Sequence, residues 1–337
     1  MGYINLNKQA FFHNSDYYSK ILGNKNKICI ALKDNAYGHG IEPMAQLAQE
    51  YGIQHTMVRN IDEAKRASKY NFESILILYE LPTKIEQKNF IFSMNSLENL
   101  EQCIDNCTIE LKIDTGMGRN GILPSEISKA LQIIEKKHLQ LYGVFTHFSC
   151  ADENDAITFN QEKLFLDSID TIKSLINKPF RIHCANSAGV HKVNNDLYDM
   201  ARVGIGLYGY LDLPQVKKCV KPVLSLHAKK ISTRVLQKGD TINYGATYTV
   251  SRDNFVVSNY DVGYSDGFFR LNERKTAKIA NNKAILGRVS MDSLSVEGDD
   301  AEICIFNNAR DLAKVHDTVH YEILTNLHRG VEKFIIQ

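Results

Sequence analysis

The sequence predicts an α/β protein built from an N-terminal (β/α)8 TIM-like barrel and a C-terminal, mostly β domain. Two observations predict the barrel: apolar, β-rich runs alternate with amphipathic ones over the first two thirds of the chain, and eight β-rich runs can be counted. A third observation predicts the second domain, because short apolar runs broken by Gly, Asn and Asp turns begin near residue 216. We therefore expect the barrel over residues 1–215 and the β domain over residues 216–337.

The eight predicted barrel strands are short and rich in aliphatic residues. They cover residues 27–33, 54–58, 74–80, 91–94, 108–114, 141–147, 180–185 and 199–203. Helix-like segments at residues 61–67, 125–134 and 159–175 lie between them and supply the crossovers that join parallel strands. Because eight parallel strands with helical crossovers close into a barrel, we expect the chemistry at the carboxyl ends of the strands.

The second domain is predicted from short strands separated by turns. They cover residues 222–228, 231–235, 240–244, 255–258, 284–289 and 301–306. A polar, turn-rich stretch at residues 211–215 precedes them and suits a linker between the two domains.

Composition is that of an ordinary globular protein and argues against several classes of partner. Of the 337 residues, 44% are hydrophobic and 23% are charged. With 40 basic and 39 acidic residues the formal charge is +1, so no bulk field favours a nucleic acid or a membrane surface. No apolar run approaches the ~18 residues of a membrane helix, and the first residues lack the basic-then-apolar pattern of a secretion signal. We expect a cytoplasmic protein.

The cysteine pattern agrees with that location. Seven cysteines, an odd number, are spread from Cys29 to Cys304, which fits free thiols in a reducing compartment better than a disulfide framework. Cys103 and Cys107 lie four residues apart, but no second ligand pair is near them in the sequence. We therefore expect core or helix-surface thiols and no metal centre.

Unusual polar residues gather at the predicted carboxyl ends of the barrel strands. They are Lys33 after the first strand, Lys112 and Asp114 in the fifth, His147 after the sixth, Asn186 and Ser187 after the seventh, and Arg202 at the end of the eighth. A purely structural role would scatter such groups over both ends of the barrel. Their clustering favours a functional site at this end.

Lys33 is the first candidate for chemistry. It ends a buried strand and is followed by a tight turn that closes on Gly38 and Gly40. An ammonium group that loses hydration there is costly, and the usual outcome is a lowered pKa or a covalent bond to a carbonyl cofactor. Taken alone, Lys33 is explained more simply as a lysine whose methylene groups are buried while its ammonium group reaches solvent.

A glycine-rich segment at residues 116–121 offers a rival interpretation. It matches the GxGxxG pattern, follows a strand and precedes a helix, with Glu135 nearby, as in a dinucleotide-binding turn. The same pattern recurs at residues 204–209, and the first βα unit, where a dinucleotide fold carries its fingerprint, has Lys33 and no such motif. The position of the motif argues against a nicotinamide enzyme.

Characteristic sequence blocks occur in order over nearly the whole chain. They are residues 33–40 (KDNAYGHG), 112–119 (KIDTGMGR), 143–148 (GVFTHF), 186–188 (NSA), 198–205 (YDMARVGI), 243–248 (NYGATY), 263–267 (GYSDG) and 287–292 (GRVSMD). In this order the blocks resemble the alanine racemase family, the barrel-type racemases that use pyridoxal 5′-phosphate (PLP). The chain departs from the family where Val203 replaces the usual proline and where residues 322–332 replace the usual Arg-Val-Pro run.

The resemblance implies a racemase with two bases, one on each face of the substrate Cα. Lys33 would bind the cofactor covalently and serve the D face, and Tyr244 of a partner subunit would serve the L face. A free tyrosine, with a pKa of about 10, is a poor base, and His147 is the candidate that relays its proton. A site shared in this way implies a head-to-tail homodimer with an inactive monomer.

Other residues are assigned to the cofactor by resemblance. Arg202 would face the pyridine nitrogen, where a permanent positive charge disfavours protonation and suppresses side reactions. The phosphate would be bound by Tyr37, Ser187 and the backbone amides of Gly204 and Ile205. His147 and Asn186 would complete the cofactor site.

The substrate contacts are implied in the same way. Arg119 resembles the family's anchor for the substrate carboxylate. Lys112 matches a lysine that is often carbamylated in the family, and the added negative charge would hold Arg119. Met291 and Asp292 resemble residues of the substrate pocket, and Tyr264 resembles part of the corridor leading to it.

The resemblance favours alanine as substrate, supplying D-alanine for peptidoglycan, but two groups of alternatives stay open. Serine or a broader range of amino acids is possible, because a pocket discriminates weakly between a methyl and a hydroxymethyl group. A barrel-type decarboxylase would carry an acidic residue in place of Arg202, and a non-catalytic PLP carrier would need neither Tyr244 nor the second domain. The residues present disfavour the decarboxylase and the carrier.

Overall fold

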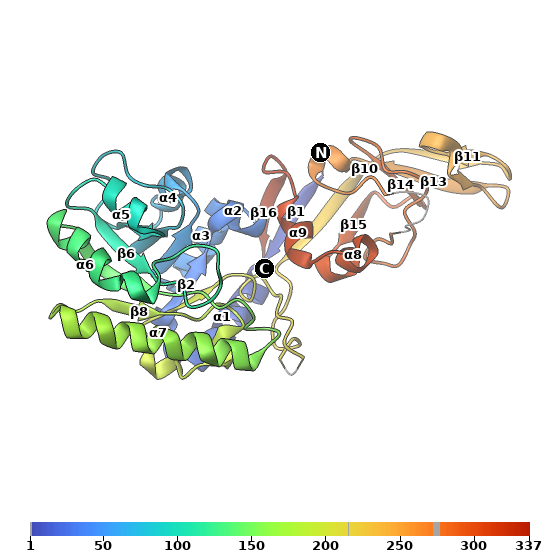
Figure 1. The fold of residues 1–337 in the computed structure, drawn as a ribbon. Helices are drawn as coiled ribbons and strands as arrows, with labels where there is room; N and C mark the ends of the chain where they lie inside the picture. The colour runs from blue at the N-terminus through green and yellow to red at the C-terminus, as the bar shows by residue number, and fades with distance from the viewer. Residues whose placement is uncertain (1, 215, 272–276) are drawn as a thin grey trace. The chain divides into compact units, whose positions relative to one another are not determined.

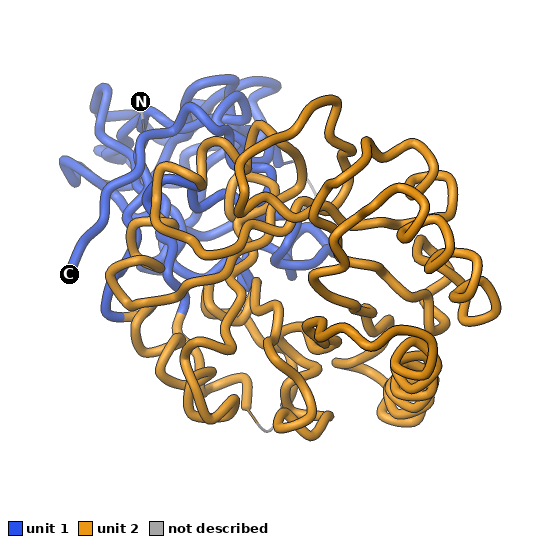
Figure 2. The backbone as a smooth tube through the Cα atoms, turned by 90° about the vertical axis from the view of Figure 1, so that its left-hand side faces the viewer, with its two compact units in different colours: residues 1–9, 37–43, 222–337 blue, residues 10–36, 44–221 orange. Residues whose placement is uncertain are grey.

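The structure, a computed structural model, describes residues 2–214, 216–271 and 277–337. The chain divides into two compact units (Figure 2). The first unit comprises Met1–Gln9, Tyr37–Pro43 and Pro222–Gln337, and the second comprises Ala10–Ala36 and Met44–Lys221. The second unit therefore carries the predicted barrel strands, and the first carries the C-terminal strands together with two short segments from early in the chain.

Eight parallel strands form the sheet of the second unit. They are β2 (Ile28–Ala31), β3 (His55–Val58), β4 (Ser74–Ile77), β5 (Phe90–Met94), β6 (Thr108–Lys112), β7 (Gln140–Phe145), β8 (Arg181–His183) and β9 (Ala201–Val203). Their order is β8-β7-β6-β5-β4-β3-β2-β9, and every pairing is parallel. This confirms the predicted barrel class and all eight strand positions, although most strands are shorter than predicted.

Backbone hydrogen bonds also join the two outer strands of this sheet. Asp199 N donates to Ile182 O (2.9 Å), and Arg202 N donates to Ala185 O (2.9 Å). Because Ile182 lies in β8, which is labelled in Figure 1, and Arg202 lies in β9, these bonds bring the edge strands together. The sheet thereby closes on itself as a barrel.

Helices alternate with these strands along the chain. They are α1 (Lys8–Leu22), α2 (Lys33–Tyr37), α3 (Ile41–Tyr51), α4 (Ile61–Ala67), α5 (Leu97–Gln102), α6 (Ile127–Lys136) and α7 (Asp155–Leu175). The three predicted helices correspond to α4, α6 and α7, and α7 begins earlier than predicted because the Asn154 side chain caps it by accepting Ile157 N–H. In the described part of the chain, no helix is long and apolar enough to cross a membrane.

The barrel strands are buried along most of their length. Every residue of β2, β3, β4 and β5 is buried, as expected for parallel strands covered by helices. In β6, however, two charged side chains are buried as well: Glu110 is 0% exposed and Lys112 is 5% exposed. Because a buried charge is costly unless partners compensate it, these residues indicate a functional region.

The first unit contains a sheet in the order β14-β13-β10-β1-β16, with β15 paired to β10. Its strands are β1 (Tyr3–Asn7), β10 (Leu224–Leu236), β13 (Phe255–Tyr260), β14 (Leu294–Glu297), β15 (Glu302–Phe306) and β16 (Glu332–Ile336), and a separate hairpin pairs β11 (Thr241–Ile242) with β12 (Tyr248–Thr249). The helices α8 (Ala309–His316) and α9 (His320–Thr325) follow β15. The mostly β character predicted for the C-terminal domain is confirmed.

Several predicted details of this unit are wrong. The two strands predicted at residues 222–228 and 231–235 are replaced by one continuous strand, β10, which begins at Leu224; its first half pairs with β1 and β15 while its second half pairs with β13. Residues 284–289 form only isolated bridges, and the regular strand lies at β14 instead. The predicted strand at 240–244 is limited to Thr241–Ile242, since Tyr244 already begins a 3-10 turn.

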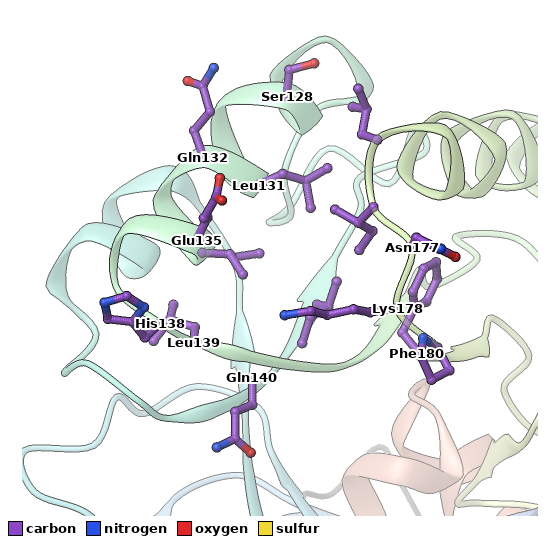
Figure 3. Close-up of a pocket in the computed structure, with 15 residues that line it drawn as sticks. Ser128, Leu131, Gln132, Glu135, His138, Leu139, Gln140, Asn177, Lys178 and Phe180 are labelled. Carbon is purple, nitrogen blue, oxygen red and sulfur yellow. The ribbon is translucent and has the colours of Figure 1, made fainter.

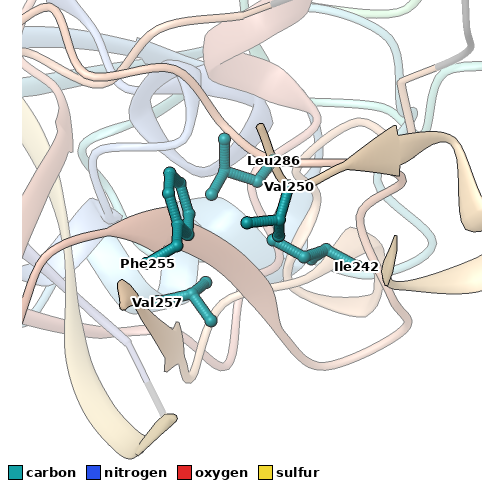
Figure 4. Packing of buried hydrophobic residues seen from close by; sticks show 5 residues of the cluster. All are labelled: Ile242, Val250, Phe255, Val257 and Leu286. Atoms are coloured by element: carbon teal, nitrogen blue, oxygen red, sulfur yellow. The ribbon is translucent and has the colours of Figure 1, made fainter. Parts of the chain in front are cut away.

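A small apolar cluster anchors the β11–β12 hairpin (Figure 4). Ile242, Val250, Phe255, Val257 and Leu286 are each at most 7% exposed. Burying an aliphatic or aromatic side chain of this size stabilises a fold by roughly 1.5–3 kcal/mol. The cluster therefore fixes the connection between the two hairpin strands, which carries Tyr244.

Candidate active site

Most of the predicted site residues lie at the carboxyl ends of the barrel strands. Lys33 follows β2, Lys112 ends β6, His147 follows β7, Asn186 and Ser187 follow β8, and Arg202 lies in β9. Because the strands are parallel, these positions gather at one end of the barrel. Asp114 lies two residues beyond β6 and not inside it, which corrects the predicted strand end.

Asp114 organises the glycine-rich turn after β6. Its Oδ1 accepts hydrogen bonds from the backbone N–H groups of Gly116 (2.9 Å), Met117 (2.9 Å) and Gly118 (3.2 Å). These are amides that a dinucleotide phosphate would need. The GxGxxG segment is therefore a turn built around a carboxylate, which disfavours the nicotinamide interpretation.

Arg202 is buried and held by several acceptors. Its Nη1 donates to His183 Nδ1 (2.5 Å), and its Nη2 donates to Thr146 O (2.6 Å), Cys184 O (3.1 Å) and His147 Nδ1 (3.3 Å). The residue is only 3% exposed. A guanidinium keeps its charge in proteins, so Arg202 places a fixed positive charge in the barrel.

His183 connects Arg202 to Glu110. His183 Nε2 lies 2.8 Å from Glu110 Oε2, and both side chains are fully buried. An arginine can only donate, so His183 Nδ1 accepts from Arg202 and His183 Nε2 carries the proton that is donated to Glu110. Burial lowers the pKa of His183 to about 4, which keeps the imidazole neutral. The three side chains thus form a carboxylate, imidazole and guanidinium chain inside the barrel.

The sequence analysis missed Glu110 and His183. A signal existed, because Glu110 stands between Ile109 and Leu111 in an apolar strand, where an acidic residue requires a partner. The partner could not be read from the sequence, since β6 and β8 are separated by β7 in the sheet.

His147 lies in the field of four cationic side chains. Burial lowers its pKa well below the usual value, and Arg202, Lys112, Arg119 and Lys33 lower it further. The imidazole is therefore neutral at pH 7. A concentration of positive charge around a neutral group favours an anionic ligand.

Acid is expected to unfold the cofactor-free chain, because buried histidines must become charged. Burial lowers the pKa of His183 and His55 to about 4, from an ordinary value of 6.5. Between these pH values the unfolded chain binds more protons, so the free energy of unfolding falls as the pH falls, by about 1.4 kcal/mol per pH unit for each histidine. Urea unfolding at several pH values within this window measures the slope.

Two substitutions test the origin of that pH dependence. His183→Gln should reduce the slope of the free energy of unfolding against pH, because one group that binds a proton in the unfolded chain but not in the folded chain is removed. The matched control is His13→Gln, because His13 is exposed. An equal slope in His183→Gln and in the unmodified chain would contradict the assignment.

Lys33 begins α2 and pairs with the next residue. Its Nζ lies 3.6 Å from Asp34 Oδ2, and Asp34 Oδ1 lies 3.1 Å from Arg59 Nη1. The side chains of Lys33, Asp34 and Arg59 are 27%, 34% and 59% exposed. An exposed ion pair contributes at most about 1 kcal/mol, so it does not prevent Lys33 from reacting with a carbonyl group.

The backbone behind Lys33 is left-handed. Asp34, Asn35, Ala36 and Tyr37 have φ values between 53° and 55°. This conformation costs an L-residue roughly 1–2 kcal/mol, and it persists only where surrounding contacts impose it. Tyr37 ends the turn, and within the first unit its ring lies 5.9 Å from that of Tyr321.

The two polar residues after β8 bind backbone amides. Asn186 Oδ1 accepts two N–H groups of the following turn, at 3.1 and 2.8 Å. Ser187 Oγ accepts from Gly204 N–H and Gly206 N–H, both at 3.1 Å. Ile205 lies between these glycines and is buried. The loop after β9 is thus folded around a hydroxyl group, with backbone donors gathered at one place.

Lys112 is buried beside Asn120, whose Oδ1 accepts a hydrogen bond from the Lys112 amine. Burial lowers the pKa of Lys112 to about 8, and the charges of Arg119 and Arg202 contribute to the shift. A substantial fraction of the amine is therefore neutral in mildly alkaline solution. The Arg119 side chain itself is exposed.

Tyr244 lies on an exposed turn of the first unit. It begins the 3-10 turn Tyr244–Ala246 and is 66% exposed. The preceding residue, Asn243, donates through Nδ2 to Leu286 O (2.9 Å) and Ser295 Oγ (3.1 Å). The turn is therefore fixed while the phenol is free to contact another molecule.

Tyr264, Met291 and Asp292 lie on two adjoining loops of the same unit. Tyr264 N donates to Ser290 O (3.1 Å), and the residue after Tyr264 donates its N–H to Met291 O (2.8 Å). A Cβ at Gly263 would lie 2.3 Å from Met291 O, so only glycine permits this approach. All three predicted side chains are exposed.

A groove of about 1060 Å³ lies between α6 and the segment that follows α7 (Figure 3). Leu131, Leu139 and Phe180 contribute to its apolar lining. Gln140 begins β7 and Phe180 precedes β8, so the groove lies at the amino ends of these strands. It is at the opposite end of the barrel from Lys33, and we exclude it from the candidate active site.

Comparison with known proteins settles the family. Residues 6–212 match the family model for the alanine racemase N-terminal domain, and residues 223–335 match the model for the alanine racemase C-terminal domain. The chain belongs to the alanine racemase family. An alanine racemase of a Nitratiruptor species is 40% identical over 334 residues, 97% of each chain. One from Campylobacter jejuni subsp. jejuni is 37% identical over 100% of each chain.

Solved structures of the family share this fold. The alanine racemase of Clostridium difficile 630 aligns with a TM-score of 0.89 at 24% identity, covering 99% of this chain and 95% of that one. The alanine racemase of Bacillus anthracis, with bound L-Ala-P, aligns with a TM-score of 0.87 at 25% identity, covering 100% and 95%. Membership of the alanine racemase family confirms the predicted family and makes the chain an isomerase.

Proposed function

We propose that the chain is a PLP-dependent alanine racemase that interconverts L- and D-alanine and supplies D-alanine for peptidoglycan. The observation that carries the proposal is the gathering of Lys33, His147 and the buried Arg202 at the carboxyl ends of the barrel strands, with Arg202 donating to His147, at the end of the barrel where this fold places its chemistry. Family membership supports it, and the structure of the Bacillus anthracis relative holds L-Ala-P.

The residues at this end of the barrel fit a cofactor that carries a phosphate and an aldehyde. The backbone N–H groups gathered around Ser187 fit the phosphate, and Lys33 supplies the amine that would bind the aldehyde. Arg202, with its fixed charge, would disfavour protonation of the pyridine nitrogen. When bound, PLP supplies the electron sink for the negative charge left on the substrate Cα. We assign Tyr37, His147, Asn186, Ser187, Gly204 and Ile205 to the remaining cofactor contacts.

Inversion at Cα requires a proton to leave one face and another to arrive at the opposite face. We assign the D face to Lys33 Nζ and the L face to the phenolic oxygen of Tyr244 from a second copy of the chain. His147, which is neutral and bonded to Arg202, is the candidate that relays the tyrosine proton. The exposure of Tyr244 supports a head-to-tail homodimer with two shared sites.

We assign the substrate carboxylate to Arg119, whose exposed guanidinium can form two parallel hydrogen bonds. Met291 and Asp292 of the second copy would line the pocket around the substrate side chain. Tyr264 would line the corridor that leads to it. The exposure of all three supports contact with another copy of the chain.

Lys112 is expected to form a carbamate with carbon dioxide. The neutral amine attacks carbon dioxide, forms an N–C bond and releases one proton, so the lowered pKa of about 8 favours the reaction. The new negative charge would hold Arg119. NMR of the protein in 13C-bicarbonate should show a carbamate resonance that is lost in Lys112→Ala and kept in the control Lys25→Ala. A resonance that survives Lys112→Ala would contradict the assignment.

Loss of optical rotation by L-alanine in deuterated water tests the proposed activity. With PLP added, the rotation should decay to zero and deuterium should appear at Cα of both enantiomers. L-serine followed in parallel measures the choice of substrate. Unchanged alanine with bound cofactor would overturn alanine as the substrate, and a protein that binds no PLP would overturn the cofactor assignment.

A further inference from the structure

Glu63 binds the left-handed turn that follows Lys33. Its Oε1 accepts from Asn35 N–H (3.0 Å), and its Oε2 accepts from Asp34 N–H (3.2 Å) and Arg59 N–H (2.9 Å). Glu63 is only 2% exposed. One buried carboxylate therefore bonds the first two amides of the strained turn.

The position of this carboxylate is fixed by α4. Glu63 is the third residue of α4, and its own N–H donates to the capping side chain of Asn60 (2.9 Å). Ile61 N–H donates to Glu80 Oε2 (2.7 Å), which secures the same helix end. Because α4 follows β3 and β3 pairs with β2, Glu63 links the loops at the carboxyl ends of two neighbouring strands (Figure 1).

Two further contacts hold the same turn. Arg66, also in α4, donates through Nη2 to Asn35 Oδ1 (3.2 Å), and Ala36 N–H donates to Leu32 O (2.8 Å). No glycine lies between Lys33 and Tyr37 to make the left-handed backbone easy. The conformation is imposed by its surroundings, and α4 supplies much of them.

We propose that Glu63 is a positioning residue for Lys33. Its carboxylate holds the left-handed turn. This turn fixes the backbone from which the Lys33 amine reaches the site. The consequence for cofactor binding rests on the proposed function, whereas the consequence for the turn does not. Glu63 touches neither substrate nor cofactor in this scheme and acts only through the turn.

The two acceptor oxygens of Glu63 are essential to this role. Three N–H donors approach its two oxygens, so both oxygens must accept. In Glu63→Gln the side chain keeps its size, but its NH2 group must face at least one of these donors. Glu63→Gln therefore removes hydrogen bonds to the turn with little change in packing.

Hydrogen exchange in the cofactor-free protein tests the effect on the turn. Glu63→Gln should speed exchange in a peptide covering residues 31–37 by about tenfold or more, because bonds to a charged acceptor are lost, and should leave β6 unchanged. The control is Glu126→Gln, since Glu126 accepts one backbone N–H, from Leu123, elsewhere in the barrel unit. Exchange in the 31–37 peptide at the rate of the unmodified protein would overturn the proposal. An equal increase in exchange in the 31–37 peptide and in β6 would overturn it as well.

Cofactor titration tests the effect on Lys33. Glu63→Gln should weaken PLP binding by about tenfold or more and lower kcat, with little change in KM for alanine. Faster exchange at the turn with unchanged PLP affinity and kcat would overturn the positioning role. If the unmodified protein binds no PLP, the proposed function fails while the exchange result still decides the role of Glu63 at the turn.

A second variant guards against a folding defect in Glu63→Gln. Glu63→Asp keeps the charge but shortens the side chain by one methylene, so it should give a smaller increase in exchange at residues 31–37 than Glu63→Gln. Exchange at residues 31–37 that is unchanged in both variants would show that the carboxylate does not hold the turn, and would overturn the proposal.

Discussion

Lys33→Ala is expected to abolish the visible absorption of the bound cofactor and to reduce racemisation by about 10⁴-fold or more, because one group supplies both the covalent attachment and a base. Stability should change little. Lys33 is partly exposed, and its contact with Asp34 at 3.6 Å is a partly exposed ion pair. Absorption spectra after dialysis against PLP, together with the rate of rotation loss, measure both effects.

The matched control for this experiment is Lys25→Ala. Lys25 is an exposed lysine of the same unit, outside the candidate site. It should keep both the absorption band and the activity. A band that persists unchanged in Lys33→Ala would show that another amine binds the cofactor, and Lys112, with its lowered pKa, would be the next residue to substitute.

The barrel could be predicted because its information is local. Each strand is a short aliphatic run, and the parallel arrangement buries it on both faces, as β2 to β5 show. The strand ends then follow from the same pattern, so Lys33, His147 and Arg202 could be placed together without any knowledge of their partners.

The C-terminal unit was predicted less well because its pairings are distant in sequence. The strand β1 pairs with β10, and β16 pairs with β1, so the sheet joins the two ends of the chain. The periodicity of hydrophobic residues along one segment does not show which distant strand that segment pairs with. The long strand β10 was divided in two because its polar centre, at Lys229 and Lys230, resembles a turn.

The site itself was predicted unevenly for a similar reason. The local sequence makes Lys33 a candidate, and the family resemblance gives it a role. Tyr244 is one of 16 tyrosines, and only family resemblance distinguishes it. Glu63 lies in an amphipathic helix where a glutamate in the first turn looks like an ordinary helix residue. Its three backbone contacts become visible only when α4 and the turn after Lys33 are brought together.

Tyr244→Phe is expected to slow proton abstraction from L-alanine by about 10²–10⁴-fold, the usual loss when a general base is removed. The Cα proton of D-alanine should still exchange with deuterated water, because Lys33 remains. Folding should be unaffected, since Tyr244 is 66% exposed. The control is Tyr248→Phe on the same hairpin. Equal loss of exchange from both enantiomers in Tyr244→Phe would contradict the two-base assignment.

Mixing two inactive variants tests whether Tyr244 acts in the partner subunit. A dimer of one Lys33→Ala chain and one Tyr244→Phe chain contains one site with both defects and one site with neither, provided that each site takes Lys33 from one chain and Tyr244 from the other. Random reassociation of equal amounts should therefore restore about a quarter of the unmodified activity. If both residues of a site came from one chain, every site would keep a defect, and the mixture would stay as inactive as its components.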